Sequence, residues 1–206
     1  MPVKTNERIY RMMQPFTVPS EEDANKKRFD SAYYVEGYAT TFNQPYLLFS
    51  WDGVDYYEQI DRKAFEGADM SDVIMQYNHE GRVYARNGNG TLGMETDDHG
   101  LFIYADLSKT ERAKDLYEDI AAGMITEMSW AFTEWERSFD KSNNTWTVRK
   151  VRKVYDVSAV SRGANPATEI SARTLLDGVI EQQERESLKR RLQILKIKTL
   201  LEEIKR

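Results

Sequence analysis

The chain has 206 residues, with 34 acidic and 29 basic side chains, a net charge of −5 and no cysteine. A domain of this length can bury enough surface to fold without disulfides or metals, and a mildly acidic chain lacks the positive surplus that general nucleic-acid binding requires. The absence of cysteine excludes thiol nucleophiles and thiolate metal sites. No apolar run approaches 18 residues, and the first ten residues lack an apolar signal segment, so we expect neither a membrane span nor secretion.

The chain begins with a polar segment, residues 1–30, which we interpret as an arm with an irregular loop. Residues 31–42 are rich in β-branched and aromatic side chains and predict a strand. Within this strand, Gly37 indicates a bulge or a close approach of two backbones. A second strand is predicted at residues 72–77, and it ends just before His79.

Turn sequences divide the next part of the chain. Two Asn-Gly pairs at residues 87–90 favour a tight turn with positive φ, and a further turn at residues 97–100 makes residues 82–107 a predicted β-meander. A helix is then predicted to begin at a capping box, in which Ser108 and Glu111 satisfy each other's backbone amides. Its apolar residues recur at helical spacing, and Gly123 is placed to end it.

Two long strands follow and predict a hairpin. Residues 124–139 place large side chains on one face and small ones on the other, and residues 145–161 return after a polar turn. Loops of two or four residues place Ser129 and Asp156 directly opposite or diagonally opposite, and on the same face in every case. A loop with an odd number of residues, or a bulge, would separate them. Opposed Cβ atoms lie about 5 Å apart and diagonal ones about 7–8 Å, and the diagonal spacing leaves more room for an imidazole between the two side chains.

Residues 181–206 contain no glycine or proline and predict one amphipathic helix. Such a helix packs on its own domain, on a second copy in a dimer, or on another protein. We therefore expect an α+β, mainly β fold with a domain at residues 31–177 and a C-terminal amphipathic helix at residues 178–206.

Few residues are candidates for acid–base or nucleophilic chemistry. His79 follows a strand end and is a better general base than His99, which lies in a polar turn. Ser129 has small neighbours on its own face of the strand, which would leave space for a substrate backbone. Asp156 lies in an otherwise apolar strand, so its carboxylate either faces solvent or is buried against a partner such as imidazole. A structural histidine and a packed core serine remain alternatives.

Other charged residues in the sequence are better explained as solvent-exposed than as functional. Glu134 and Glu136 share a predicted strand face, as in a glycosidase pair, but exposed glutamates are a commoner explanation. The basic residues 149–153 fall on both faces of a strand, and we interpret them as a solvated edge, with a nucleic-acid patch as the less favoured alternative. The sequence contains no G-x-S-x-G elbow, P-loop, dinucleotide-binding or H-E-x-x-H motif.

Several short blocks resemble the prohead protease family of tailed bacteriophages. They run in order from Val-Glu-Gly-Tyr-Ala at residues 35–39, through residues 58–65, to Met-Gln-Tyr-Asn-His at residues 75–79. They continue at residues 123–132 and end with Asp-Val-Ser-Ala-Val at 156–160, followed by Ala-Asn-Pro-Ala at 164–167. The family's fold is similar to that of the herpesvirus assemblins, which implies a small closed β-barrel flanked by helices.

The resemblance implies a serine endopeptidase that cleaves scaffold segments of capsid protein, and also itself, inside the immature capsid in the host cytoplasm. By matching positions, Ser129 is the nucleophile, His79 the general base and Asp156 the third member, although the family commonly has glutamate there. Glu80 and Glu127 are the alternatives for that third role.

By similarity to the assemblins, oxyanion or substrate contacts are expected from the loop with Arg162 and Gly163, and the enzyme is expected to be a homodimer. The resemblance implies no metal and no cofactor, and the composition leads us to expect no membrane and no specific nucleic acid as partners. A catalytically silent scaffold or capsid-binding module on the same fold is the alternative. A nonviral esterase is disfavoured because the chain lacks the strand–elbow–helix motif of that fold.

Overall fold

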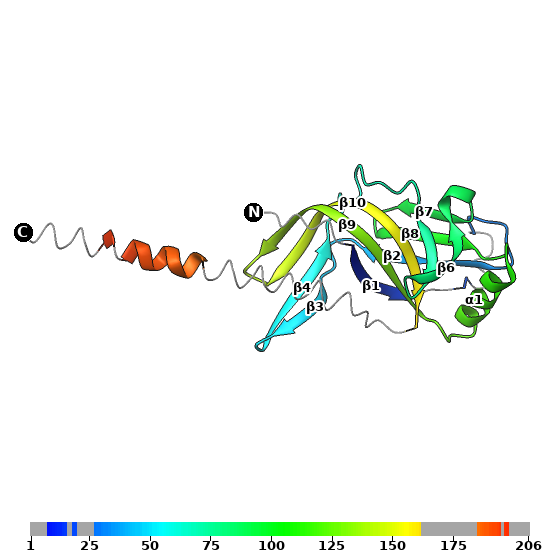
Figure 1. Ribbon diagram of the computed structural model, residues 1–206, viewed down its shortest axis with the longest axis horizontal. Coiled ribbons are helices and arrows are strands. Elements are labelled where there is room, and N and C mark those ends of the chain that lie inside the picture. Colours follow the sequence, from blue (N-terminus) through cyan, green and yellow to red (C-terminus); the bar gives the residue numbers. More distant parts are fainter. Residues whose placement is uncertain (1–7, 16–17, 20–26, 162–184, 195, 198–206) are drawn as a thin grey trace, which may run out of the picture. The chain divides into compact units, whose positions relative to one another are not determined.

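The computed structural model describes residues 8–15, 18–19, 27–161, 185–194 and 196–197. The chain divides into two compact units, Met1–Thr168 and Glu169–Arg206. The first unit is mainly β, as the sequence analysis predicted, and its described residues form two sheets and one α-helix (Figure 1). The expected boundary at residues 177–178 falls outside the described residues.

The larger sheet has seven strands and contains most of the long-range pairing. Its main path runs β1–β9–β10–β4–β3, and β5 pairs with both β10 and β6. Strand β10 is long enough to receive β4 as a parallel neighbour near its start and β5 near its end. The strands are β1 (Ile9–Pro15), β3 (Tyr46–Trp51), β4 (Val54–Ile60), β5 (Ile74–Tyr77), β6 (Glu80–Arg86), β9 (Glu127–Asp140) and β10 (Thr145–Val160).

The smaller sheet has the strand order β2–β8–β7, with β2 at Tyr34–Thr41, β7 at Leu92–Thr96 and β8 at Gly100–Asp106. The expected closed barrel does not form among the described residues, because β1, β3, β6, β2 and β7 each have a hydrogen-bonded neighbour on one side only. An isolated bridge between Phe42 and Ile60 links the end of β2 to β4. The fold is therefore two sheets around a shared core.

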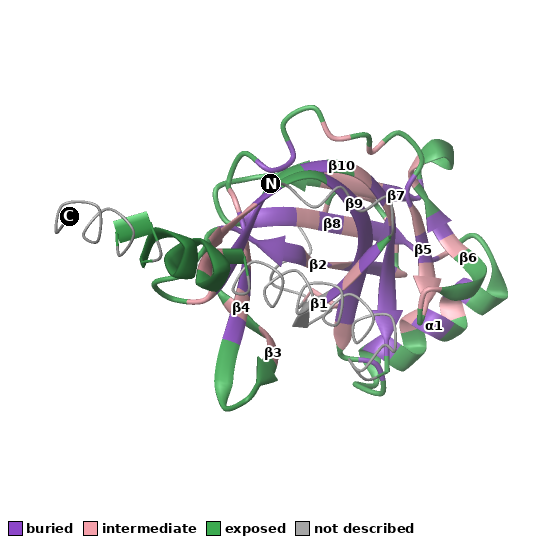
Figure 2. Ribbon diagram, turned by 60° about the vertical axis from the view of Figure 1, so that its left-hand side comes forward, coloured by how far each residue is buried: buried purple, intermediate pink, exposed green. Residues whose placement is uncertain are grey.

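The core lies where the inner faces of the sheets are buried (Figure 2). Trp130 and Phe132 project from the large-residue face of β9, and their rings stack at a centroid distance of 4.0 Å. These residues are completely buried, as are Val35 of β2 and Ile103 of β8. The alternation of large and small residues predicted for β9 is therefore what directs this strand toward the core.

The predicted hairpin is formed by β9 and β10, and it is the longest pairing in the molecule. A four-residue connection separates Asp140 from Thr145, so the strands start directly opposed. Register shifts at several points along the hairpin then change the pairing, and Ser129 finally lies opposite Ser158. Because the net shift is two residues, Ser129 and Asp156 become diagonal neighbours on one face. The sequence analysis expected a bulge to separate them, but several bulges together keep them on one face.

Other sequence expectations need correction. Residues 9–15, within the expected irregular arm, form β1 and pair antiparallel with β9. The hairpin β3–β4 was not predicted, although its Asp52-Gly53 turn, with φ of 50° and 74°, is a typical hairpin signal. Residues 82–107 do not form a meander, since β6 pairs with β5 in one sheet and β7 with β8 in the other. Between β6 and β7 lies a short 3₁₀-helix, η2 (Asn87–Asn89).

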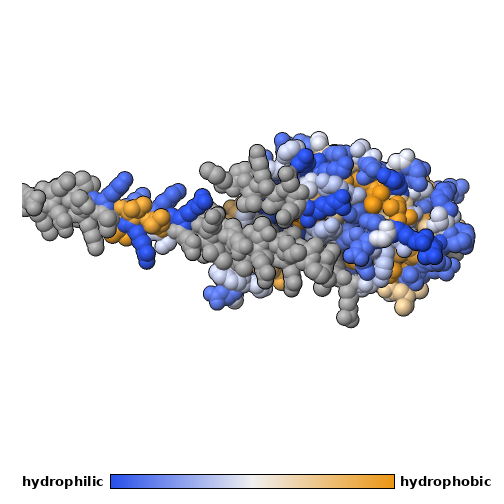
Figure 3. Space-filling model, in the orientation of Figure 1, coloured by the Kyte–Doolittle hydropathy of each residue, from blue (hydrophilic) through white to orange (hydrophobic). Residues whose placement is uncertain are grey.

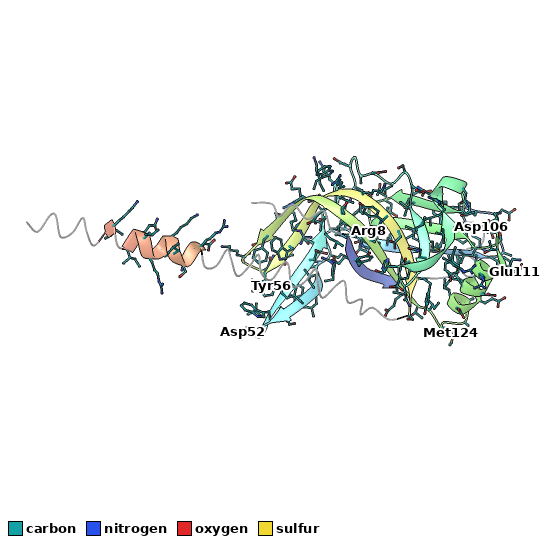
Figure 4. The ribbon with its side chains drawn as sticks, in the orientation of Figure 1. Arg8, Asp52, Tyr56, Asp106, Glu111 and Met124 are labelled. Carbon is teal, nitrogen blue, oxygen red and sulfur yellow. The ribbon has the colours of Figure 1, made fainter. Side chains whose placement is uncertain are left out.

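The predicted helix is α1 (Glu111–Ala121), and its N-cap is Thr110 instead of Ser108. The Thr110 hydroxyl accepts a hydrogen bond from the amide of Ala113 at 3.1 Å. The amide of Ser108 donates to the Asp106 carboxylate, in the turn that precedes the helix. Gly123 has φ of 70° just beyond the end of the helix, as the sequence analysis predicted. Figure 4 shows Asp106 and Glu111 near the start of this helix.

One glycine is required by a close approach between the strands of the smaller sheet. A Cβ atom on Gly100 would lie 2.0 Å from the carbonyl oxygen of Thr40 in β2. The nearby register shift between Tyr38 and Thr40 gives β2 a bulge, close to the position that Gly37 indicated. This contact explains why a glycine stands at the start of β8.

In the second unit, residues 185–194 and 196–197 are helical. Four large apolar side chains of this helix are more than half exposed: Leu188, Leu192, Ile194 and Ile197. They appear as an orange patch between hydrophilic side chains (Figure 3). This agrees with the predicted amphipathic helix, whose remaining residues lie outside the described ones.

Candidate active site

The candidate nucleophile lies on a strand that is buried on both faces. Ser129 follows Glu127 and Met128 at the start of β9, between β1 on one side and β10 on the other. Its relative exposure is 5%. The small side chains predicted on its face, including that of Ala131, leave the space in which other groups reach it.

His79 is placed by the tight turn between β5 and β6. Asn78 and His79 are the two residues of this turn, and both have positive φ, at 51° and 60°. Such a pair corresponds to a type I′ hairpin turn, in which glycine is the favoured second residue. A residue other than glycine or asparagine in this left-handed region of backbone conformation costs of order 1–3 kcal/mol. The surrounding structure must therefore hold His79 in place.

The turn is anchored to β10. Tyr77 pairs with Ala159, and the amide of Asn78 donates to the Ala159 carbonyl oxygen at 3.0 Å. The side-chain oxygen of Asn78 accepts from the amide of Ser161 at 3.2 Å. These bonds fix the position of His79 relative to the strand that carries Asp156.

The three candidate residues form one continuous chain of hydrogen bonds. The imidazole Nε2 of His79 lies 2.6 Å from the hydroxyl oxygen of Ser129, and Nδ1 lies 2.5 Å from Oδ1 of Asp156. The side chains of His79 and Asp156 are only 4% and 3% exposed. The diagonal spacing across the hairpin therefore accommodates an imidazole between hydroxyl and carboxylate, and this is the arrangement of a serine nucleophile, a base and an orienting acid.

Two further residues contact this chain, and the sequence analysis did not identify them. The hydroxyl of Ser158 donates to Oδ1 of Asp156 at 2.8 Å, and Ser158 is completely buried. The ring of Tyr10 in β1 packs edge-on against His79, with ring centroids 4.7 Å apart and planes at 72°. The period-two alternation along the strand could have indicated Ser158, but Tyr10 becomes visible only through the pairing of β1 with β9.

Other candidate residues lie apart from this chain. His99 is exposed in the β7–β8 turn and packs against Tyr38. Glu80 is exposed, and Glu127 has a buried Oε2 with no hydrogen-bond partner among the described residues. Neither glutamate replaces Asp156 at Nδ1 of His79. Arg162 and Gly163 lie outside the described residues.

The glutamates considered as a glycosidase pair do not share a face. Glu134 is 6% exposed, whereas Glu136 is exposed to solvent, because the register shifts between them. In the basic segment, Arg149 and Lys153 form ion pairs with Asp61 and Asp69 at 2.7 and 2.8 Å. The segment is therefore partly neutralised by neighbouring carboxylates.

A buried cluster of charges lies on the opposite face of β1 and β9. Arg11 contacts Glu58 through two hydrogen bonds, and the Nη2–Oε2 distance is 2.9 Å. Arg137 pairs with Glu134 and lies 3.8 Å from Glu58, while the Tyr46 hydroxyl donates to Glu58. Burial favours the neutral acid, but the charge and hydrogen bonds of Arg11 outweigh it and lower the pKa of Glu58. Burial dominates at Glu134 and raises its pKa despite the pairing with Arg137.

A family model for the caudovirus prohead serine proteases matches residues 19–181. The chain belongs to this family. A comparison with curated proteins and a comparison with solved structures each gave no significant match. The part matched by the prohead protease model includes Ser129, His79 and Asp156, whereas β1 precedes it.

The hydrogen-bond chain of the site is made by three side chains of the protein, those of Ser129, His79 and Asp156. Among the described residues of this prohead protease family member, no three His, Asp or Glu side chains converge in a way that would hold a metal ion. In the same part of the chain, no helix combines the length and apolar character that crossing a membrane requires. The chemistry available is that of a hydroxyl, an imidazole and a carboxylate in a row.

Proposed function

We propose that this chain is a serine endopeptidase of phage capsid maturation, with Ser129 as nucleophile, His79 as general base and Asp156 as the residue that orients His79. The observation that carries the proposal is the continuous hydrogen-bond chain from the hydroxyl through both imidazole nitrogens to a carboxylate. Membership of the prohead serine protease family supports the same function.

The geometry supports the following sequence of steps. With its Nδ1–H donated to Asp156, His79 has a lone pair at Nε2 that accepts the hydroxyl proton of Ser129. As Oγ forms a bond to the peptide carbonyl carbon, Nε2 takes the proton, and the carbonyl electrons move to oxygen. Collapse of this intermediate breaks the C–N bond, and Nε2–H protonates the leaving amine. Water then attacks the acyl carbon and gives a proton to Nε2. The C–Oγ bond breaks, the peptide acid is released, and Nε2–H returns the proton to Ser129.

Asp156 has two tasks in this mechanism. It fixes the tautomer of His79 by accepting from Nδ1, and its charge stabilises the imidazolium formed in each step. The Ser158 hydroxyl donates to Oδ1 of Asp156, the same oxygen that lies next to Nδ1 of His79, and so helps to hold the carboxylate in place. Donors for the developing oxyanion are also required, since one such donor is worth about 2.7–4 kcal/mol, and we assign this task to the loop with Arg162 and Gly163.

The proposed substrates are scaffold segments of the capsid protein and the protease itself, and the proposed place of action is the prohead interior in the host cytoplasm. The family to which the chain belongs supports this setting. We include a homodimer in the proposal, by similarity to the assemblins, and light scattering at high concentration tests it. A monomer under those conditions would remove the dimer and leave the catalytic assignment untouched.

Intact mass spectrometry over time tests the catalytic assignment. Wild type, Ser129→Ala and Ser142→Ala are incubated alone, with the cognate major capsid protein, and with assembled proheads. Ser142 is a matched control, because it is an exposed serine in the β9–β10 turn that bonds to Asp140. We expect discrete fragments from wild type and Ser142→Ala and none from Ser129→Ala. Uncut protein in every mixture would instead support a catalytically silent scaffold or capsid-binding module.

A further inference from the structure

The N-terminal strand contributes a side chain to the candidate active site. Tyr10 pairs with Ala131, two residues after Ser129, so its side chain emerges on the same face of the sheet as the nucleophile. There its ring packs edge-on against the His79 imidazole at 4.7 Å. Figure 1 shows β1, in dark blue, beside β9. This strand lies outside residues 19–181, the part that the family model matches.

The next residue of the strand fixes its register. Arg11 emerges on the opposite face, where its side chain is 2% exposed and forms two hydrogen bonds to Glu58 of β4. A slip of β1 by one residue would exchange its two faces. The Tyr10 side chain would then point away from His79, and the Arg11 side chain would point away from Glu58. The buried Arg11–Glu58 pair thus fixes the register of β1 and, with it, the position of the Tyr10 ring next to His79.

The contact with the Tyr10 ring restrains the His79 imidazole in a direction in which its hydrogen bonds do not. Its hydrogen bonds to Ser129 and Asp156 use the two ring nitrogens and therefore act in the plane of the imidazole. The turn that holds it has exposed residues on either side, Asn78 and Glu80, yet the His79 side chain is only 4% exposed. An aromatic ring packed against the imidazole opposes tilting of the ring and excludes water from it.

We propose that Tyr10 is a positioning residue for His79 and that β1, fixed by the Arg11–Glu58 pair, is required for full reactivity of Ser129. The inference rests on the function proposed above. It extends the site to a segment that precedes the family match. The proposed positioning of His79 does not depend on the hydroxyl group of Tyr10, because the contact is made by the ring.

The rate at which a fluorophosphonate labels Ser129 tests this without a known peptide substrate. The full-length chain is used, and intact mass gives the labelled fraction. An aromatic pair is worth about 0.5–1.5 kcal/mol, which corresponds to a rate change of about two- to tenfold. We expect Tyr10→Ala to label about tenfold more slowly than wild type, and Tyr10→Phe to label within about twofold of it.

The chain offers a matched control in its other sheet. Tyr38 also packs edge-on against a histidine, His99, with centroids 4.5 Å apart and planes at 77°. Tyr38→Ala therefore removes a similar tyrosine–histidine contact, and we expect it to leave the labelling rate unchanged. Tyr10→Leu retains apolar bulk on β1, so we expect it to unfold at the wild-type urea midpoint and still to label slowly.

The outcomes separate this inference from the proposed function. Labelling of wild type but not of Ser129→Ala supports the nucleophile. If Tyr10→Ala or Tyr10→Leu then labels at the wild-type rate while folded, the positioning role is wrong and the proposed function stands. An equal loss in Tyr38→Ala would also overturn the inference, because it would reflect general destabilisation. No labelling of wild type would overturn both.

Discussion

Replacing Glu58 by glutamine should destabilise the protein strongly, although the change is nearly isosteric. Glu58 is completely buried and faces two guanidinium groups, those of Arg11 and Arg137, while Glu134 is the second acid of the cluster. The wild-type cluster has two positive and two negative groups. After the substitution, two buried cations share one carboxylate.

The size of the effect follows from this imbalance. Removing one partner of a buried ion pair typically costs about 3–5 kcal/mol, because the remaining charge is left without compensation in the interior. That is a large part of the 5–15 kcal/mol by which domains are usually stable. The lowered pKa of Glu58 means that its contribution is present above the unfolded-state value near pH 4 and is lost as the pH falls through the folded-state value.

Equilibrium urea unfolding at pH 7, followed by tryptophan fluorescence, measures the change in the free energy of unfolding. We expect Glu58→Gln to lose about 3–5 kcal/mol, and Arg11→Met/Glu58→Gln to lose at least about 2 kcal/mol less than the two single changes together. The exposed pair Arg62–Asp98 is the control, and its neutralisation should cost less than about 1 kcal/mol. A loss below about 1 kcal/mol in Glu58→Gln, or additive single changes, would refute the reasoning.

Three further changes test individual contacts. Ser158→Ala removes a hydrogen bond to Asp156 and should slow fluorophosphonate labelling about tenfold; an unchanged rate would mean that His79 alone orients the carboxylate. Hydrogen bonds outweigh the effect of burial and lower the pKa of Asp106 to about 2, so Asp106→Asn should cost about 1 kcal/mol at pH 7. Because the lowered pKa stabilises the folded state only above the unfolded-state value, this difference should shrink as the pH falls from about 4 to 2, and a constant difference in urea titrations would contradict the assignment. Gly100→Ala places a Cβ 2.0 Å from a backbone oxygen and should lower the thermal midpoint by the equivalent of about 1–3 kcal/mol; an unchanged midpoint would show that β2 can move aside.

Local sequence patterns predicted the elements that depend on neighbouring residues. The spacing of apolar residues predicted α1 and its end at Gly123, alternation predicted β9, and a composition rich in β-branched and aromatic residues predicted β2. The N-cap was assigned two residues too early because Ser108 and Thr110 are both favoured N-cap residues, and in the structure the Thr110 hydroxyl is the one that accepts from the first turn of the helix. Strand β1 was missed because its sequence, Ile-Tyr-Arg-Met-Met-Gln-Pro, shows no regular alternation of polar and apolar residues and lies within an otherwise polar segment.

For the candidate site, the sequence by itself determined the residue types and a constraint on geometry. With no cysteine and two histidines, the chemistry was limited to hydroxyl, imidazole and carboxylate groups, and hairpin periodicity placed Ser129 and Asp156 on one face. Tertiary structure decided the rest. The position of His79 depends on pairing between β5 and β10, and that of Tyr10 on pairing between β1 and β9. Both are long-range backbone pairings, which no local pattern encodes because their partners are brought together only when the sheet forms.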